Sequence, residues 1–170
     1  MRKKGLALEP NEILLPNIDE VWEILNNIPD PEIPVISIVE LGVVRDFSMT
    51  ENHIEVIITP TYTGCPATNV FEQDITSALL SVGFKNVEIK HQYQPAWTTD
   101  WLDDDSREKL RACGIAPPDG KTSDKRYLLG QDPKVRCVQC KSDNTKMISP
   151  FGSTACKSLY QCNDCLETFD

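Results

Sequence analysis

The pattern of apolar and polar positions predicts alternating helices and strands over the first two thirds of the chain. Apolar residues recur at helical spacing in three stretches. In three further stretches apolar and polar residues alternate with a period of two, most clearly in the second of them. The expected elements are helices at 19–28, 67–82 and 104–113 and strands at 43–49, 53–62 and 86–93. In chain order they read helix, strand, strand, helix, strand, helix. This order predicts an α+β fold in which the helices pack on a small sheet.

The chain divides into three parts by composition. Residues 17–116 carry the periodic pattern and are expected to form one domain. Residues 117–133 are rich in proline, glycine and polar residues, which is typical of a linker. Residues 134–170 contain two short strand candidates, at 145–149 and 157–161, but too few apolar residues to fold on a core alone. This second domain is therefore expected to need a metal.

Charge and cysteine content narrow the function classes. The 170 residues carry a formal net charge of −9, which disfavours nucleic acid as a partner because phosphate binding needs a basic surface. No stretch approaches the length of a transmembrane segment or a signal peptide, so we expect no membrane association and a cytoplasmic location. In a reducing compartment stable disulfides are rare. The seven cysteines therefore favour metal binding or thiol chemistry.

Four of these cysteines form two Cys-x-x-Cys pairs, Cys137 with Cys140 and Cys162 with Cys165, separated by 21 residues. Each pair places two thiolates on one tight turn, and together they can complete a tetrahedron around structural zinc. Metal binding would then supply the folding free energy that the small core lacks. A closed site leaves no open position for catalysis. Two redox dithiols or an iron–sulfur cluster are the alternatives, and both suit a module without a core less well.

A fifth cysteine, Cys65, lies in Thr63-Gly-Cys-Pro66, just ahead of the helix expected at 67–82. At a helix N-terminus the macrodipole and the free backbone N–H groups stabilise an anion such as a thiolate. A thiolate placed there can act as a nucleophile or as a ligand for a soft metal. The residues equally allow an inert cysteine. No histidine lies nearby in sequence to act as a base, which weakens the case for a thiol enzyme.

Asp30 and Glu32 flank Pro31, so a rigid backbone holds two carboxylates close together. They could bind a metal, accept a proton or cap neighbouring helices, although surface carboxylates are usually only solvated. The two histidines suggest no catalytic group. His53 is expected near a turn at the start of a strand, and His91 is expected to be a core residue because of its inward register.

Two further residues leave alternatives open. Cys156 lies six residues before Cys162 and could be a small buried residue of a ribbon loop, or a surface thiol that helps to bind a transferred metal. Trp97 follows a predicted strand and could pack over the Cys65 region or face a partner.

The order of the short motifs resembles that of a known family. Asp30-Pro-Glu32, Leu41-Gly-Val-Val44, Thr63-Gly-Cys-Pro66 and Pro95-Ala-Trp-Thr98 follow one another as in SufT-like metal–sulfur cluster assembly domains. Phe151-Gly-Ser-Thr-Ala-Cys-Lys157, set within a four-cysteine ribbon, resembles the PaaD (also called PaaJ) subunits of phenylacetyl-CoA epoxidase systems. The resemblance covers about residues 17–170, and no single motif is specific by itself.

This resemblance implies an accessory protein, not an enzyme, that assembles or delivers iron–sulfur clusters in aerobic phenylacetate degradation. Cys65, Asp30 and Glu32 match the family's cysteine and acidic pair and would hold a transient iron ion or cluster. Because clusters usually take four ligands, further ligands would come from a second protomer in a homodimer or from the client. The implied client is the iron–sulfur reductase component, with the oxygenase component as a second partner. The alternative is a non-catalytic structural subunit of the epoxidase, in which the ribbon and Trp97 are contact surfaces.

Overall fold

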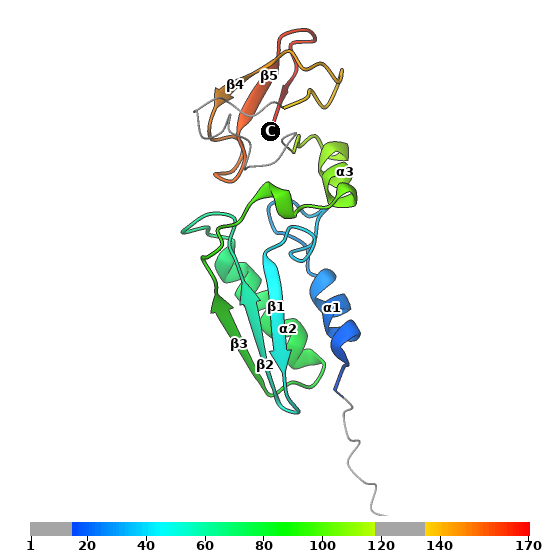
Figure 1. Cartoon of the computed structure of the whole chain (residues 1–170), viewed down its shortest axis with the longest axis vertical. Coiled ribbons are helices and arrows are strands. Elements are labelled where there is room, and N and C mark those ends of the chain that lie inside the picture. The colour runs from blue at the N-terminus through cyan, green and yellow to red at the C-terminus, as the bar shows by residue number, and fades with distance from the viewer. Residues whose placement is uncertain (1–14, 118–134) are drawn as a thin grey trace, which may run out of the picture.

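The computed structural model describes residues 15–117 and 135–170 and has the predicted α+β architecture (Figure 1). A three-stranded sheet with its helices forms the larger part, and a second three-stranded sheet forms the smaller part. The helices are α1 (Ile18–Asn26), α2 (Thr68–Ser81) and α3 (Asp104–Ala112), with a short 3₁₀ helix η1 (Thr99–Trp101). The strands are β1 (Val44–Met49), β2 (His53–Ile58), β3 (Asn86–His91), β4 (Thr145–Ser149), β5 (Leu159–Cys162) and β6 (Thr168–Phe169).

The larger sheet has the order β1-β2-β3, with β2 in the centre. β1 pairs antiparallel with β2, whereas β3 pairs parallel with β2 after the crossover through α2. Ile54, Val56 and Ile58 of β2 are fully buried, and α2 covers this face with Phe71 and Ile75 among others. β2 ends at Ile58 and not near residue 62, because a proline at position 60 has no N–H to donate to a ladder.

The helix ends follow from local sequence. Asn17 caps α1 in a capping box, in which its side chain accepts from the Glu20 backbone N–H while the Glu20 carboxylate accepts from the Asn17 N–H. Gly83 follows α2 with a φ of 112°, a conformation that glycine adopts without strain. Both observations agree with the boundaries expected from the sequence.

The smaller sheet has the order β4-β5-β6, all antiparallel. Its own core is small, consisting of Val135, Cys137, Tyr160, Cys162 and Phe169. The strand expected at 157–161 begins at Leu159, because the carbonyl of Lys157 instead accepts a loop hydrogen bond from the Gly152 N–H. The linker expected at 117–133 lies, apart from residue 117, outside the described residues, and the domain limits stay a prediction.

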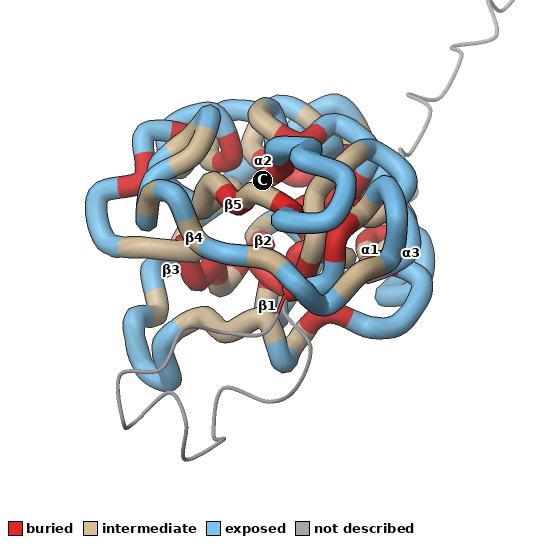
Figure 2. Tube along the Cα trace, turned by 90° about the horizontal axis from the view of Figure 1, so that it is seen from above, coloured by how far each residue is buried: buried red, intermediate tan, exposed pale blue. Residues whose placement is uncertain are grey.

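The part that contains the larger sheet contacts the part that contains the smaller sheet. The Ala116 backbone N–H, after α3, donates a 2.8 Å hydrogen bond to the carbonyl of Asp170 after β6. Viewed from above, buried segments run through the middle of the trace and exposed segments surround them (Figure 2). Within residues 15–117 and 135–170, each helix is too short or too polar to span a bilayer.

Candidate functional site

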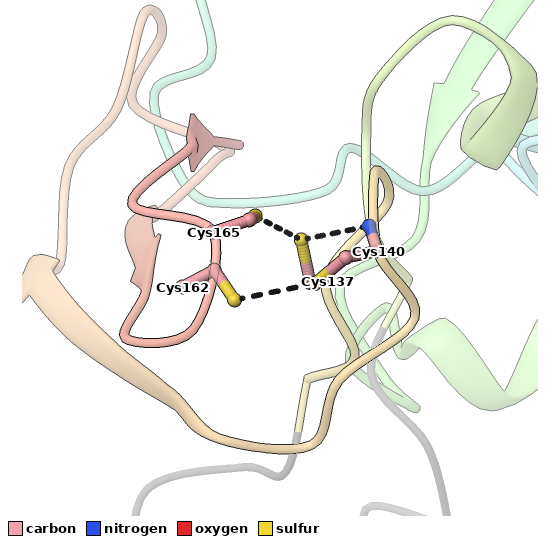
Figure 3. Close-up of side chains that lie close together, drawn as sticks. All are labelled: Cys137, Cys140, Cys162 and Cys165. Carbon is pink, nitrogen blue, oxygen red and sulfur yellow. Dashed lines mark hydrogen bonds between the residues drawn. The ribbon is translucent and has the colours of Figure 1, made fainter.

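The thiols of Cys137, Cys140, Cys162 and Cys165 converge at one end of the smaller sheet (Figure 3). All four sulfur atoms lie within 4.8 Å of one another. Cys137 Sγ is 3.7 Å from Cys165 Sγ, and Cys140 Sγ is 3.5 Å from Cys162 Sγ. Sulfur atoms at the corners of a tetrahedron with Zn–S bonds of about 2.3 Å would lie about 3.8 Å apart. The separations are too long for disulfides, which need about 2 Å.

The two Cys-x-x-Cys turns have the same backbone design. The Lys141 N–H donates to the Cys137 carbonyl, and the Leu166 N–H donates to the Cys162 carbonyl, at 3.0 and 3.1 Å. Lys141 and Leu166 both have left-handed backbones, with φ values of 64° and 66°. This conformation costs a non-glycine residue about 1 kcal/mol or more. In both turns the left-handed residue is the one that follows the second cysteine.

The cysteines fit zinc by chemistry as well as by geometry. The backbone N–H of Cys165 is the first cause that lowers the pKa of the Cys162 thiol to about 7. At Cys165 a backbone hydrogen bond from Glu167 is outweighed by burial and by the neighbouring thiols, which raise its pKa to about 12. The cluster thus supplies one thiolate readily, and a bound metal would displace the remaining protons. Around the two turns, Asn144 donates a 2.7 Å hydrogen bond to Asp164, and Ser142 also donates to Asp164. These bonds fix the relative position of the turns. The four cysteines form a metal-binding cluster of the zinc-ribbon type.

A separate pocket of about 230 Å³ lies between the two parts of the molecule. Its walls are mostly apolar, with Phe71, Leu102 and Leu110 from the larger part and Val135 and Tyr160 from the ribbon. Set into these walls are Cys65, Asp30, Glu32 and Trp97, together with Cys156, Lys157 and Asp170 of the ribbon. The structure thus brings the predicted cargo-binding residues into one cavity.

Cys65 lies in the turn that leads into α2. Its N–H donates to the Tyr62 carbonyl, and its own carbonyl accepts from the Thr68 N–H, the first residue of the helix. Ala67, at the N-cap, offers no side-chain acceptor, so no capping side chain offsets the positive end of α2. Only 8 % of Cys65 is exposed, so its thiol faces the pocket and not the open surface.

Asp30 and Glu32 have different environments. Asp30 is buried, and its Oδ1 atom accepts hydrogen bonds from the backbone N–H groups of Glu32 and Ile33 at 2.8 and 2.7 Å. Burial raises the pKa of Asp30, although the two backbone bonds oppose the rise. Asp30 therefore shapes the turn that presents Glu32 to the pocket. A metal-binding role for either carboxylate stays a prediction.

Glu32 meets residues from both parts of the molecule. The Cys156 thiol donates a 3.3 Å hydrogen bond to Glu32 Oε2. The phenol of Tyr62 lies beside Cys65, and its pKa is raised first by desolvation, then by a hydrogen bond with Cys65 and by the nearby Glu32 and Cys156. Two thiols and a carboxylate thus line the pocket, and the phenol of Tyr62 interacts with them.

The loop that carries Cys156 is anchored by Asp170. The Asp170 carboxylate accepts from Ser153 Oγ at 2.6 Å and pairs with the Lys157 ammonium group at 3.3 Å. A Cβ atom on Gly152 would come within 2.2 Å of Asp170 Oδ1, so glycine is needed for this close approach. Sequence reasoning missed Tyr62 and Asp170, because neither belongs to a recognisable ligand pattern.

The sequence suggests positions for Trp97, His91 and His53, which the structure tests. Trp97 lines the same pocket as Cys65, and its indole Nε1–H donates a 2.8 Å hydrogen bond to the Leu41 carbonyl. The core position expected for His91 is wrong. It lies at the exposed end of β3, where its ring is 2.8 Å from a Glu72 carboxylate oxygen of α2. His53 does begin β2, as expected.

Among the described residues, one other group has three donor atoms close enough for a metal, namely His53, Glu55 and Glu88. The Lys90 ammonium group pairs with Glu55 there, and His53 is 3.9 Å from Glu88. These side chains are partly solvated and already paired with one another, and nothing further points to a ligand.

Comparison with known proteins identifies the class of each part. Residues 18–90 match the iron–sulfur cluster assembly protein family, and residues 121–170 match the PaaD zinc beta ribbon domain family. The chain therefore combines an iron–sulfur assembly domain with a zinc ribbon. A solved structure, the domain of unknown function DUF59 from Bacillus anthracis, shares the fold with a TM-score of 0.50 and 24 % identity, over 54 % of this chain and 89 % of that chain.

Two relatives define the family more closely. The chain is 46 % identical to an Escherichia coli (strain K12) protein that bears the name of a 1,2-phenylacetyl-CoA epoxidase subunit, over 91 % of this chain and 92 % of that protein. It is 28 % identical to an "Fe-S protein maturation auxiliary factor" of Porphyromonas gingivalis (strain ATCC BAA-308 / W83), over 59 % of this chain and 96 % of that protein. The chain belongs to the PaaD family, as its motifs indicated.

Proposed function

We propose that this protein is a maturation factor that carries iron, or an iron–sulfur cluster, to a component of a phenylacetyl-CoA epoxidase system. The observation that supports this most is the position of Cys65, at the start of α2 and inside a pocket that also holds Glu32. A thiolate and a carboxylate are both ligands of iron. The match of residues 18–90 to iron–sulfur assembly proteins supports the same chemistry.

The pocket suits a cargo that is held and then released. Apolar walls exclude water from a bound metal, and Cys65 provides a soft ligand at one point of the wall. One chain offers fewer cysteines there than the four ligands that a cluster usually takes. The remaining ligands would come from small molecules, a second protomer or the client, which allows transfer by ligand exchange. Asp30 would keep Glu32 in place through its two backbone hydrogen bonds.

The zinc ribbon has a structural role in this proposal. Cys137, Cys140, Cys162 and Cys165 would fill the tetrahedral coordination of zinc, leaving no open position for a substrate. Zinc, when bound, supplies folding free energy to a domain with a core of five residues. The protein is accordingly an accessory factor and not the catalyst. The name of the E. coli relative points to an epoxidase as the system that is served. The proposed clients within it are the iron–sulfur reductase component and the oxygenase component, which the family resemblance implies.

Anaerobic reconstitution tests the role of Cys65. The zinc-loaded full chain is incubated with ferrous iron and sulfide, desalted, and analysed for iron, sulfide and zinc. We expect the wild type to retain iron and Cys65→Ser to lose it, while both keep about one zinc per chain. Cys113→Ser is the matched control, because Cys113 is an exposed thiol at the end of α3. Equal iron retention by Cys65→Ser and the control would contradict the proposal.

A second candidate function is a structural subunit of the epoxidase complex, which the name of the E. coli relative favours. In that case the protein would co-purify with the oxygenase in stoichiometric amounts, and Cys65→Ser would leave the cluster content of the reductase component unchanged. A maturation factor would associate transiently, and its Cys65→Ser variant would lower that cluster content.

A further inference from the structure

Cys156 of the ribbon faces the same pocket as Cys65 of the assembly domain. The two cysteines come from parts of the chain that have separate cores, and each part places its thiol through its own backbone. Cys65 is positioned by the turn before α2, and Cys156 by the loop between β4 and β5. Both thiols therefore line one pocket because the ribbon is docked on the larger part.

We infer that Cys156 is a second thiolate ligand of the cargo, so that the ribbon closes the cargo site. This inference rests on the proposed function, because it assumes that Cys65 binds iron. The hydrogen bond from Cys156 to Glu32 shows that the thiol reaches a residue of the assembly domain, and Tyr62 contacts Cys65 in the same neighbourhood. A soft metal held between Cys65 and Cys156 would join the two parts of the molecule.

The ligand exchange is balanced without a redox step. The Cys156 thiol loses its proton to the Glu32 carboxylate, the base to which it donates a hydrogen bond, and the carboxylic acid then returns the proton to solvent. The sulfur takes the coordination position of a water molecule, which leaves the ferrous ion. No electrons are transferred, and the iron remains ferrous.

The geometry is that of an open site. Within the described residues, Cys65, Glu32 and Cys156 are not among the groups whose donor atoms all lie within 4.8 Å of one another. Cys156 is exposed at the pocket's edge, whereas Cys65 is buried in its wall. In the proposed site the Cys156 side chain would rotate inwards to bind the metal and outwards to release it. A resident metal centre needs a closed cage like that of the ribbon, but a transferred cargo needs this opening.

Side-chain contacts on both sides of Cys156 fix the backbone of its loop. Asp170 binds Ser153 and Lys157, which lie on the two sides of Cys156, and Gly152 leaves room for the Asp170 carboxylate. The Cys156 thiol also contacts the Thr154 hydroxyl at 3.0 Å. Because the loop is anchored at both sides, only the Cys156 side chain needs to move when the cargo binds.

The test uses the full chain, loaded with zinc and titrated anaerobically with ferrous iron, in four forms: wild type, Cys65→Ser, Cys156→Ser and Cys113→Ser. X-ray absorption counts the sulfur ligands per bound iron. We expect two protein sulfur ligands in the wild type and in Cys113→Ser. Cys156→Ser should keep one sulfur ligand and bind iron at least about tenfold more weakly. The zinc content confirms that the ribbon of each variant is folded.

The outcomes separate the two proposals. If wild type and Cys156→Ser have the same affinity and the same sulfur count, while Cys65→Ser loses iron, the inference about Cys156 is overturned and the proposed function stands. If the wild type binds no iron, or Cys65→Ser binds as well as wild type, the proposed function fails. If Cys156→Ser weakens binding without reducing the sulfur count, Cys156 is not a ligand and the inference is overturned.

Discussion

Glu32 and Cys156 lie 124 positions apart in the sequence, yet the Cys156 thiol donates a 3.3 Å hydrogen bond to the Glu32 carboxylate. This contact joins the assembly domain to the ribbon at the edge of the pocket that contains Cys65. Under the proposed function, this contact would let the ribbon contribute to cargo binding although its own four cysteines are used for zinc.

The first prediction concerns the reactivity of Cys156. Desolvation raises the pKa of this thiol, and the hydrogen bond and negative charge of Glu32 add to the rise against an opposing hydrogen bond with Thr154, so the neutral thiol is favoured at neutral pH. Glu32→Gln removes the charge and should lower the pKa of Cys156. At pH 8 more of it would then be thiolate, and its reaction with iodoacetamide should be faster. Peptide mapping by mass spectrometry over time measures the rate.

Cys113 is the internal reference for that experiment, because it is an exposed thiol in the same chain. Its alkylation rate should be the same in the wild type and in Glu32→Gln. A rate for Cys156 that is unchanged or lower in the variant would show that Glu32 does not hold this thiol in its neutral form.

The second prediction concerns Gly152. In Gly152→Ala the new Cβ atom would lie within 2.2 Å of Asp170 Oδ1, so the carboxylate must move. Its hydrogen bonds to Ser153 would weaken at a cost of about 1 kcal/mol, and the loop would no longer hold Cys156 beside the pocket. We expect iron retention to fall towards that of Cys156→Ser while zinc stays bound. Ser153→Ala, which removes the 2.6 Å bond without a clash, should have a smaller effect in the same direction.

The third prediction concerns zinc removal. Cys137 is fully buried, and Cys137→Ser should abolish zinc binding and unfold the ribbon, because its core of five residues cannot fold alone. The larger domain has a core of its own and should still melt cooperatively. Zinc analysis and limited proteolysis check this, with the new cleavage sites expected in the ribbon. Equal protease resistance of the ribbon with and without zinc would contradict a structural role for the metal.

The fourth prediction concerns the strained turn at Leu166. This residue has a φ of 66°, and 70 % of it is exposed, so its side chain contributes little packing. Leu166→Gly relieves the left-handed strain and should make the ribbon more stable against zinc loss by about 1 kcal/mol. Competition with a chromogenic chelator measures the change. A Leu166→Ala variant keeps a Cβ atom and should gain nothing, which separates backbone strain from side-chain loss.

The helices and strands were predictable because each buries one face. The apolar stripe of α2 and the alternation in β2 indicate both elements without any tertiary contact, and the two Cys-x-x-Cys pairs indicate the metal cluster because ligand spacing is local. The predicted ends of strands were wrong where neighbouring residues or solvent exposure determine the end. β2 ends before the predicted residue 62, because a proline interrupts it. His91 has the sequence register of an inward-facing residue of β3, but it lies at the end of the strand and is exposed to solvent.

The pocket could not be predicted in the same way. Its walls come from both sides of a segment outside the described residues, so no spacing in the sequence indicates that Cys156 would meet Glu32. The proximity of Asp30 and Glu32 was visible, but not that Asp30 uses its Oδ1 atom on two backbone N–H groups. Asp170 belongs to no sequence motif that would indicate its contacts. Its role depends on a loop fold that only the structure reveals.

Transfer of cargo tests the central claim most directly. The reconstituted full chain is mixed anaerobically with the iron-free reductase component of the epoxidase, and cluster formation on the reductase is followed by its absorption and by recovered electron transfer. We expect wild type and Cys113→Ser to restore the cluster and Cys65→Ser to leave the reductase without one. If Cys65→Ser restores the cluster as fast and as fully as wild type, Cys65 does not carry the cargo and the account is wrong.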